Sequence, residues 1–160
     1  MITRSHWFGA VTLAAAVAGC SSQPSGGASS SDGSDQYPCA TETRALPYMP
    51  GMTEPSANGL FAVALMSSDP GPPIQGANTW TVGVNDTAGS PVDGLTIGVK
   101  LWMPDDRHGT SVQAAVADQG NGVYSMAPIY LFMQGYWTVT MSLQSSSGTS
   151  DSVVFPVCIP

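Results

Sequence analysis

Residues 101–110, LWMPDDRHGT, carry the side chains with the clearest capacity for chemistry in this sequence. His108 is the only histidine after the first twenty residues, and Met103 precedes it by five positions. Imidazole and thioether groups are ligands that suit Cu(I), so the pair allows a copper site. The residues between them favour a solvated surface loop instead, held by an ion pair between Arg107 and Asp105 or Asp106.

Catalysis has little support in the residue pattern. The sequence lacks the G-x-S-x-G nucleophile elbow, the H-E-x-x-H zinc motif and the phosphate-binding G-x-x-x-x-G-K loop. Asp105 and Asp106 would point to opposite sides of an extended segment, so they are poorly placed as an acid–base pair. We therefore expect a protein that is not an enzyme.

The first twenty residues, MITRSHWFGAVTLAAAVAGC, are typical of a secretory signal. Their apolar run from Trp7 to Gly19 is too short for a permanent membrane span. The final Val-Ala-Gly-Cys resembles the lipoprotein box of bacteria, which predicts a signal peptide over 1–19 and acylation of Cys20. Ser21 after the cysteine favours the outer membrane in Gram-negative cells. An ordinary signal peptide with a free Cys20 is the alternative.

A tether is predicted over residues 20–36, because SSQPSGGASSSDGSDQ contains no apolar side chain larger than alanine and cannot offset the entropy of ordering. Beyond residue 19, three basic residues stand against eleven acidic ones, a net charge of −8. Such a charge repels polyanions, so nucleic acid is excluded as a partner. The expected partners are the membrane, through the lipid, and a protein of the cell envelope.

From residue 60 onward apolar and polar side chains alternate, which is typical of strands with one buried face. Trp80, Val82 and Val84, for example, share one side of their segment. Turn-forming sequences separate seven predicted strands, near 60–67, 78–85, 94–103, 111–117, 122–130, 136–144 and 151–159. This pattern predicts an all-β domain over 60–160, an immunoglobulin-like two-sheet antiparallel sandwich, with a small barrel as the alternative.

Residues 37–59 show no periodicity and predict an extended strap that lies on the domain. Met49 and Met52 within it are expected to plug the edge of the sandwich, with a role as thioether ligands as the alternative. Cys39 and Cys158 remain for pairing in an oxidising compartment, and Cys158 lies on the outer face of the last predicted strand. We predict a Cys39–Cys158 disulfide, with two free thiols as the alternative.

Five segments together have the order of a known family. They are GANTWTVGVND (76–86), GSPVDGLTIGVKLWMP (89–104), HGT (108–110), GNGVYS (120–125) and FMQGYWTVTM (132–141). With them, the run from Asn78 to Val157 resembles the YtkA-like family of small immunoglobulin-like domains in secreted and membrane-anchored bacterial proteins. The resemblance implies an extracytoplasmic β-sandwich, and some members occur beside copper-handling systems.

In that family the segment after Met-Pro is commonly rich in His, Met and Gly. Met103 and His108 match this pattern, but Asp106 and Arg107 stand where a further ligand and a glycine are expected. The candidate metal site is therefore Met103, His108 and Met133, with the charge of Arg107 acting against a bound cation.

Trp102 and Tyr136 are the expected contact residues of the domain, because they fall on the outward face of their predicted strands. The first functional hypothesis is a lipid-anchored, non-catalytic binding module of the bacterial envelope, without a cofactor. The alternative is a periplasmic Cu(I)-binding lipoprotein linked to heavy-metal handling.

Overall fold

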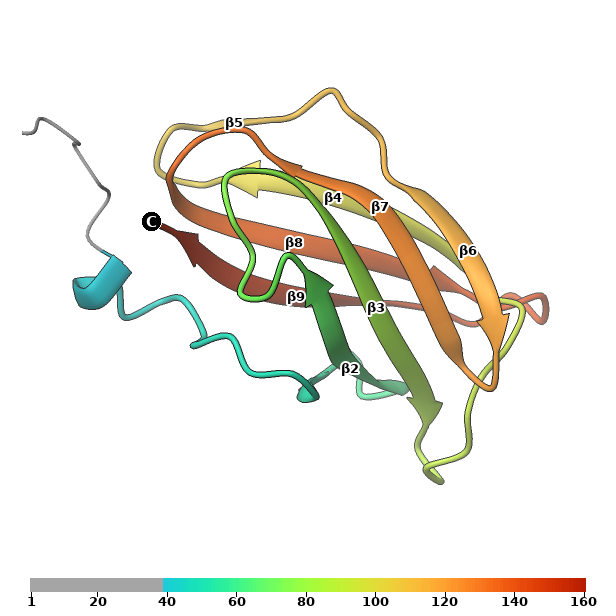
Figure 1. Cartoon of the computed structure of the whole chain (residues 1–160). Helices are drawn as coiled ribbons and strands as arrows, with labels where there is room; N and C mark the ends of the chain where they lie inside the picture. The colour runs from blue at the N-terminus through green and yellow to red at the C-terminus, as the bar shows by residue number, and fades with distance from the viewer. Residues whose placement is uncertain (1–38) are drawn as a thin grey trace, which may run out of the picture. The chain divides into compact units, whose positions relative to one another are not determined.

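Two antiparallel sheets face each other across one core. The computed structural model describes residues 39–160, so the predicted signal peptide, Cys20 and the tether lie outside the described residues. One sheet has the strand order β1-β2-β3-β7-β6 and the other β5-β4-β8-β9 (Figure 1). The elements are a 3-10 turn at Cys39–Thr41 and the strands β1 (Met52–Pro55), β2 (Phe61–Asp69), β3 (Gly76–Asp86), β4 (Thr96–Met103), β5 (His108–Gly109), β6 (Ala115–Gly120), β7 (Val123–Leu131), β8 (Gly135–Gln144) and β9 (Ser150–Ile159). Within this range no helix is long and apolar enough to cross a membrane.

The strand order is that of an immunoglobulin sandwich. The strands β2-β3-β7-β6 correspond to the A-B-E-D sheet and β4-β8-β9 to the C-F-G sheet, with β5 in the position of a short C′ strand. The predicted fold is confirmed. The barrel alternative is wrong, because within residues 39–160 no strand pairing joins the two sheets.

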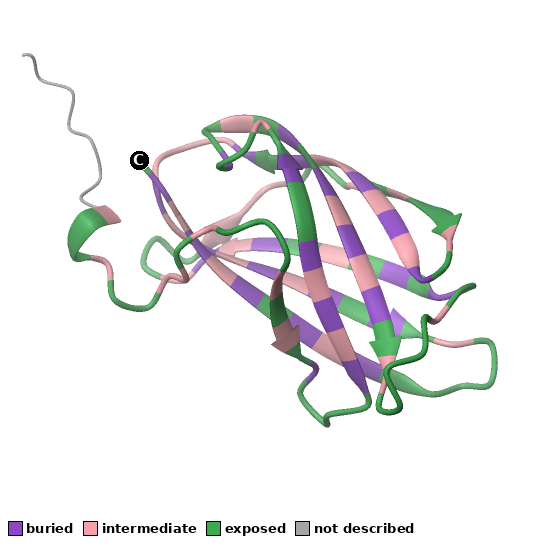
Figure 2. Ribbon diagram, turned by 60° about the horizontal axis from the view of Figure 1, so that its bottom comes forward, coloured by how far each residue is buried: buried purple, intermediate pink, exposed green. Residues whose placement is uncertain are grey.

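The core lies between the inner faces of the two sheets. Figure 2 shows buried residues alternating with less buried ones along the strands. Trp80, Val82 and Val84 are fully buried together, as the alternation predicts, and so is Trp137 from the opposite sheet. The rings of Trp80 and Phe155 meet edge to face across the core, with centroids 6.2 Å apart. Such aromatic contacts add to the stabilisation that burial alone provides.

Nine strands form where seven were predicted. The strand β1 lies inside the predicted strap 37–59, so part of that segment is a paired strand of the five-stranded sheet. The strand β1 could not be recognised in the sequence, because it has only four residues and ends in Pro55. The strand β5 is hidden because it has only two residues. The strand expected at 111–117 forms at 115–120 as β6, an exposed sheet edge without alternating burial.

Asp151 fastens the turn between β1 and β2 to the beginning of β9. Its carboxylate accepts hydrogen bonds from Ser56 Oγ (2.6 Å), from the backbone and side-chain amides of Asn58 (3.1 and 2.9 Å), and from Leu60 N (3.3 Å). Burial by itself would raise the pKa of Asp151. The hydrogen bonds outweigh burial, and they lower the pKa of Asp151 to about 2.

This carboxylate predicts a specific acid sensitivity. In the unfolded chain an aspartate titrates near pH ~3.9. The contribution of Asp151 to stability is therefore present above that pH and is lost as the pH falls toward about 2. Urea midpoints measured between neutral and strongly acid pH should fall through this window in the wild type and fall less steeply in Asp151→Asn. Asp106→Asn, at an exposed carboxylate, should keep the wild-type slope. An Asp151→Asn slope equal to that of the wild type would contradict the prediction.

Candidate functional site

Met103 and His108 lie opposite each other in a short ladder at one end of the four-stranded sheet. The strands β4 and β5 pair Met103 with His108 and Trp102 with Gly109. A Cβ atom at Gly109 would collide with the carbonyl oxygen of Leu101 and press on the Trp102 ring. Gly109 is therefore needed for the close approach of β4 and β5.

The ring of His108 packs on an aromatic side chain. It stacks on Phe132 with centroids 5.3 Å apart, and Phe132 in turn meets Trp137 edge to face at 5.3 Å. The Nδ1 atom of His108 is buried and has no hydrogen-bond partner among the described residues. His108 thus differs from the expected solvated loop residue, because Phe132 and the β4–β5 ladder hold it half-buried. Its unpaired nitrogen could bind an added ion or polar group.

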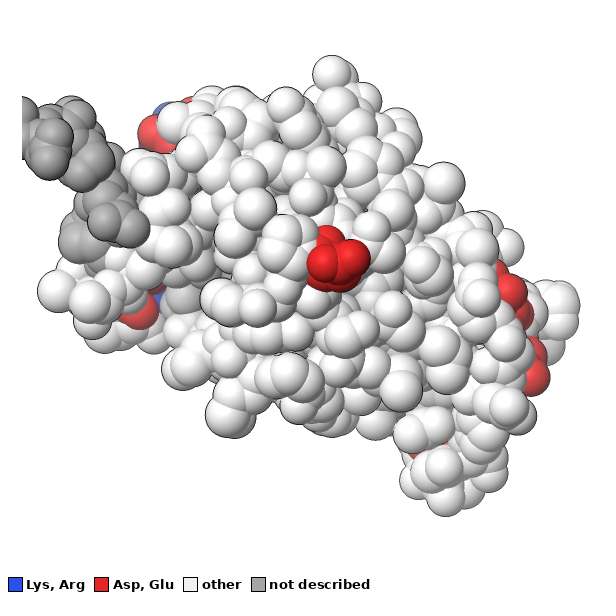
Figure 3. Space-filling view, viewed as in Figure 1, with Lys and Arg blue, Asp and Glu red and all other residues white. Residues whose placement is uncertain are grey.

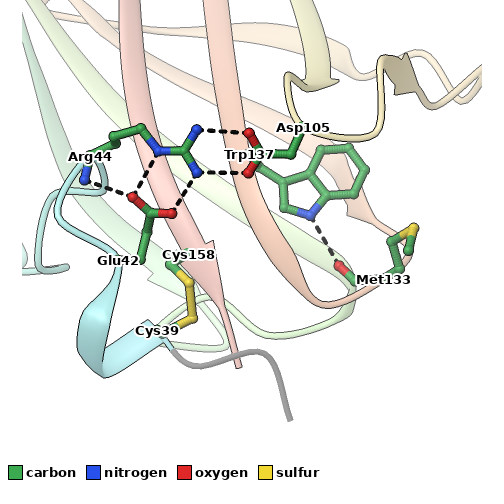
Figure 4. The surroundings of a disulfide bond; sticks show 7 residues. All are labelled: Cys39, Glu42, Arg44, Asp105, Met133, Trp137 and Cys158. Atoms are coloured by element: carbon green, nitrogen blue, oxygen red, sulfur yellow. Dashed lines mark hydrogen bonds and ion pairs between the residues drawn. A yellow bond between two sulfur atoms is a disulfide. The ribbon is translucent and has the colours of Figure 1, made fainter. Parts of the chain in front are cut away.

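The structure brings two of the three predicted ligands to one place. Directly opposed residues of an antiparallel pair present their side chains on the same face, so Met103 and His108 are neighbours. Met103 is only 1% exposed, however, and it belongs to the hydrophobic core. Met133 lies between β7 and β8, and its carbonyl oxygen accepts a hydrogen bond from Trp137 Nε1 (3.0 Å; Figure 4). Residues 39–160 contain no group of three His, Cys, Asp or Glu side chains that could hold a metal, so any site here depends on thioethers.

Asp105 pairs with Arg44, which lies far away in the sequence. The Arg44 guanidinium donates to both carboxylate oxygens of Asp105 (2.8 and 2.6 Å) and to both of Glu42 (2.9 and 2.7 Å; Figure 4). Its Cζ atom lies 4.1 Å from the ring centroid of Tyr136. The hydrogen bonds that Arg44 donates to Asp105, and then those to Glu42, raise the pKa of Arg44, so the group stays charged. The prediction that Asp105 pairs with Arg107 is therefore wrong, because Asp105 pairs with Arg44.

The first part of the predicted strap, residues 39–48, is fixed to both sheets. From here on, the strap means these residues only. The predicted Cys39–Cys158 disulfide is confirmed, with the two Cα atoms 5.6 Å apart (Figure 4). Leu46 N donates to the carbonyl oxygen of Pro156 (2.9 Å), and the Tyr48 hydroxyl accepts from Ser68 N (2.9 Å). The strap therefore runs from the outer face of β9 to the end of β2.

The two methionines next to the strap behave differently. Met52 packs against the hydrophobic core, as expected of a residue that plugs the edge of the sandwich. Met49 is 64% exposed and plugs nothing. The predicted plug is therefore confirmed for Met52 and wrong for Met49.

The predicted contact residues lie on the outer face of the four-stranded sheet. Tyr136 is half-buried, and the Arg44 guanidinium covers part of its ring. Trp102 is also half-buried, with Lys100 Nζ 5.1 Å from its ring centroid. Sequence reasoning missed Arg44 and Phe132. No sequence pattern around Arg44 indicates its role. Phe132, in contrast, directly precedes Met133 and begins the family-like segment 132–141.

These features define a small immunoglobulin-like sandwich with an N-terminal strap fastened by a disulfide and a Met–His pair at one sheet edge. A family model described as YtkA-like matches residues 60–142, more than half of the chain. The chain belongs to the YtkA-like family. Comparison with curated proteins and with solved structures found no match.

Proposed function

We propose that this protein is a lipid-anchored, non-catalytic binding module of the bacterial cell envelope. The observation that carries the proposal is the fastening of the strap. The Cys39–Cys158 disulfide and the bidentate pair of Arg44 with Asp105 join residues 39–48 to the sandwich. Acyl groups on Cys20 would then hold at a membrane a sandwich whose first described residues are already fastened to it.

Two further features support an extracytoplasmic place for the domain. The YtkA-like family consists of domains of this kind, and disulfides persist in oxidising compartments outside the cytoplasm. The signal-like residues 1–19 and the lipoprotein box at Cys20 agree with this location. We place the anchor in the outer membrane because Ser21 follows the cysteine.

A protein partner suits the surfaces of the sandwich better than a charged polymer. Figure 3 shows the face of the sheet that contains β2, β3 and β7, where charged groups are sparse: one acidic group lies near the middle of the view, and the others lie toward its edges. On the other sheet Trp102 supplies a large aromatic ring at the surface, a residue type enriched in binding hot spots. We therefore assign the main contact to Trp102, and a secondary one to the accessible part of Tyr136.

The second candidate function is Cu(I) binding, and the ladder between β4 and β5 favours it. Met103 and His108 share one face, and the buried Nδ1 of His108 lacks a partner among the described residues. A thioether, an imidazole and the Met133 thioether form a donor set that suits Cu(I). The burial of Met103 in the core acts against this function, because a bound ion would have to displace packed side chains.

One experiment separates the two candidates. A photoreactive crosslinker is installed beside Trp102 in the full-length chain in cells, and purified protein is titrated with Cu(I) against a competing chelator. Trp102→Ala should reduce capture of a defined partner at least about tenfold, equivalent to ~1.4 kcal/mol, whereas His108→Ala should leave capture unchanged. Labelling with a palmitate analogue should disappear in Cys20→Ala.

The opposite pattern would support the copper function. In that case both Met103→Ala and His108→Ala weaken Cu(I) binding at least about tenfold, and Trp102→Ala changes neither readout. Because Met103 lies in the core, urea unfolding of each variant must first show that it is folded.

A further inference from the structure

An apolar pocket of about 390 Å³ lies between the strap and the loop that joins β2 to β3. Its walls come from three segments that are distant in sequence, represented by Leu46 and Tyr48, by Pro73 and Ile74, and by Val157. Pockets of roughly 300 to 1,000 Å³ with mostly apolar walls are typical of small-ligand sites. This pocket is at the small end of that range.

The strap cannot collapse into the pocket, because it is held at both ends. Cys39 is bonded to Cys158, and Leu46 and Tyr48 are hydrogen-bonded to β9 and β2. The Tyr48 hydroxyl and the Glu42 carboxylate, the two polar side chains of the lining, are already engaged by Ser68 N and by Arg44. The pocket is therefore a fixed apolar space that offers an occupant no uncompensated charge.

We infer that this pocket binds one acyl chain of an uncharged lipid. Its volume suits a single chain and not a whole phospholipid. The net charge of −8 beyond residue 19 disfavours an anionic occupant such as a fatty acid. An acyl chain gains free energy from apolar burial alone, which is the interaction that these walls provide.

The source of the lipid is the membrane to which we propose the protein is anchored, so the inference rests on the proposed function for its ligand. Cys39 lines the pocket, and eighteen residues separate it from Cys20. Eighteen residues span at most about 60 to 65 Å even when fully extended, so an acylated Cys20 would keep the pocket near the lipid surface.

The test is a calorimetric titration of residues 34–160 with octanoyl, decanoyl and dodecanoyl glycerol, each below its micelle-forming concentration. This fragment is one compact unit with both sheets, the core and the disulfide, so it folds without the upstream residues. Each added methylene should tighten the Kd about fourfold (~0.8 kcal/mol) until the pocket is full. Glycerol alone should not bind, and decanoate should bind more weakly than decanoyl glycerol.

Ile74→Asp and Val112→Asp form a matched pair of variants. Both residues are exposed, at 47% and 38%, so both variants should fold, but only Ile74 lines the pocket. Ile74→Asp should weaken the binding of dodecanoyl glycerol at least about tenfold, whereas Val112→Asp should leave it unchanged. Absence of binding, a Kd independent of chain length, or equal binding by Ile74→Asp would overturn the inference. None of these results would affect the Trp102 capture or the Cys20 labelling, which test the proposed function separately.

Discussion

Replacing Cys39 and Cys158 by alanine should lower the free energy of unfolding by about 4 to 5 kcal/mol. The two cysteines are 119 positions apart, so their bond closes nearly all of the described chain into one loop. Without the bond the unfolded chain gains conformational freedom, whereas the core of the sandwich is unchanged. Equilibrium unfolding in urea, monitored by tryptophan fluorescence, measures the loss.

Arg44→Ala is the control for this experiment, because it removes the ion pair between the strap and Asp105 but leaves the disulfide. Its loss of stability should be much smaller, since the guanidinium and the Asp105 side chain are nearly half exposed. If the double cysteine variant lost no more stability than Arg44→Ala, the disulfide would merely position the strap. Its effect on the unfolded chain would then be negligible.

Trp137→Ala should cost about 3 to 5 kcal/mol, the range for removing a large buried aromatic side chain. The ring is fully buried, and Phe132 packs edge to face against it. Because Phe132 also carries the ring of His108, we expect the cavity to loosen the β4–β5 ladder as well. Urea unfolding measures the cost, and hydrogen exchange at Gly109 reports on the ladder.

Trp80→Phe and Trp137→Phe separate the hydrogen bond from the packing. Both tryptophan rings are fully buried, but only the N–H of Trp137 has a partner, the Met133 carbonyl oxygen. Trp137→Phe leaves that partly buried oxygen without its donor, whereas Trp80→Phe removes a donor that is already unpaired. Trp137→Phe should therefore be more destabilising by about 1 to 3 kcal/mol. Equal losses in the two variants would contradict this account.

Most of the sandwich could be predicted from alternation, because each sheet has one buried face. The burial of Trp80, Val82 and Val84 repeats the period-two pattern of the sequence. Strands that form only because another strand offers them an edge show no such alternation in the sequence. The strand β1 exists because residues 61–69 offer it an edge, and β5 exists because Gly109 can approach Leu101 closely.

The candidate site was less predictable, because contacts distant in sequence decide it. The spacing of Met103 and His108 did foreshadow their proximity, and the alternation that buries Leu101 also buries Met103. No local pattern indicates that Arg44 reaches Asp105 across 61 positions. Arg107 has a φ of +55°, a left-handed value at a position where the family favours glycine, so that departure is tolerated by the backbone at a small cost.

The disulfide also decides where mechanical tension would enter the domain. The strand β1, which follows the strap, is held to β2 by only four paired residues, whereas β9 is paired with β8 at ten positions. A pull on the N-terminal segment passes through the Cys39–Cys158 bond directly into β9. Tension between a membrane anchor and a bound partner would thus be borne by the longest ladder of the sandwich, and β1 would not be peeled from its edge.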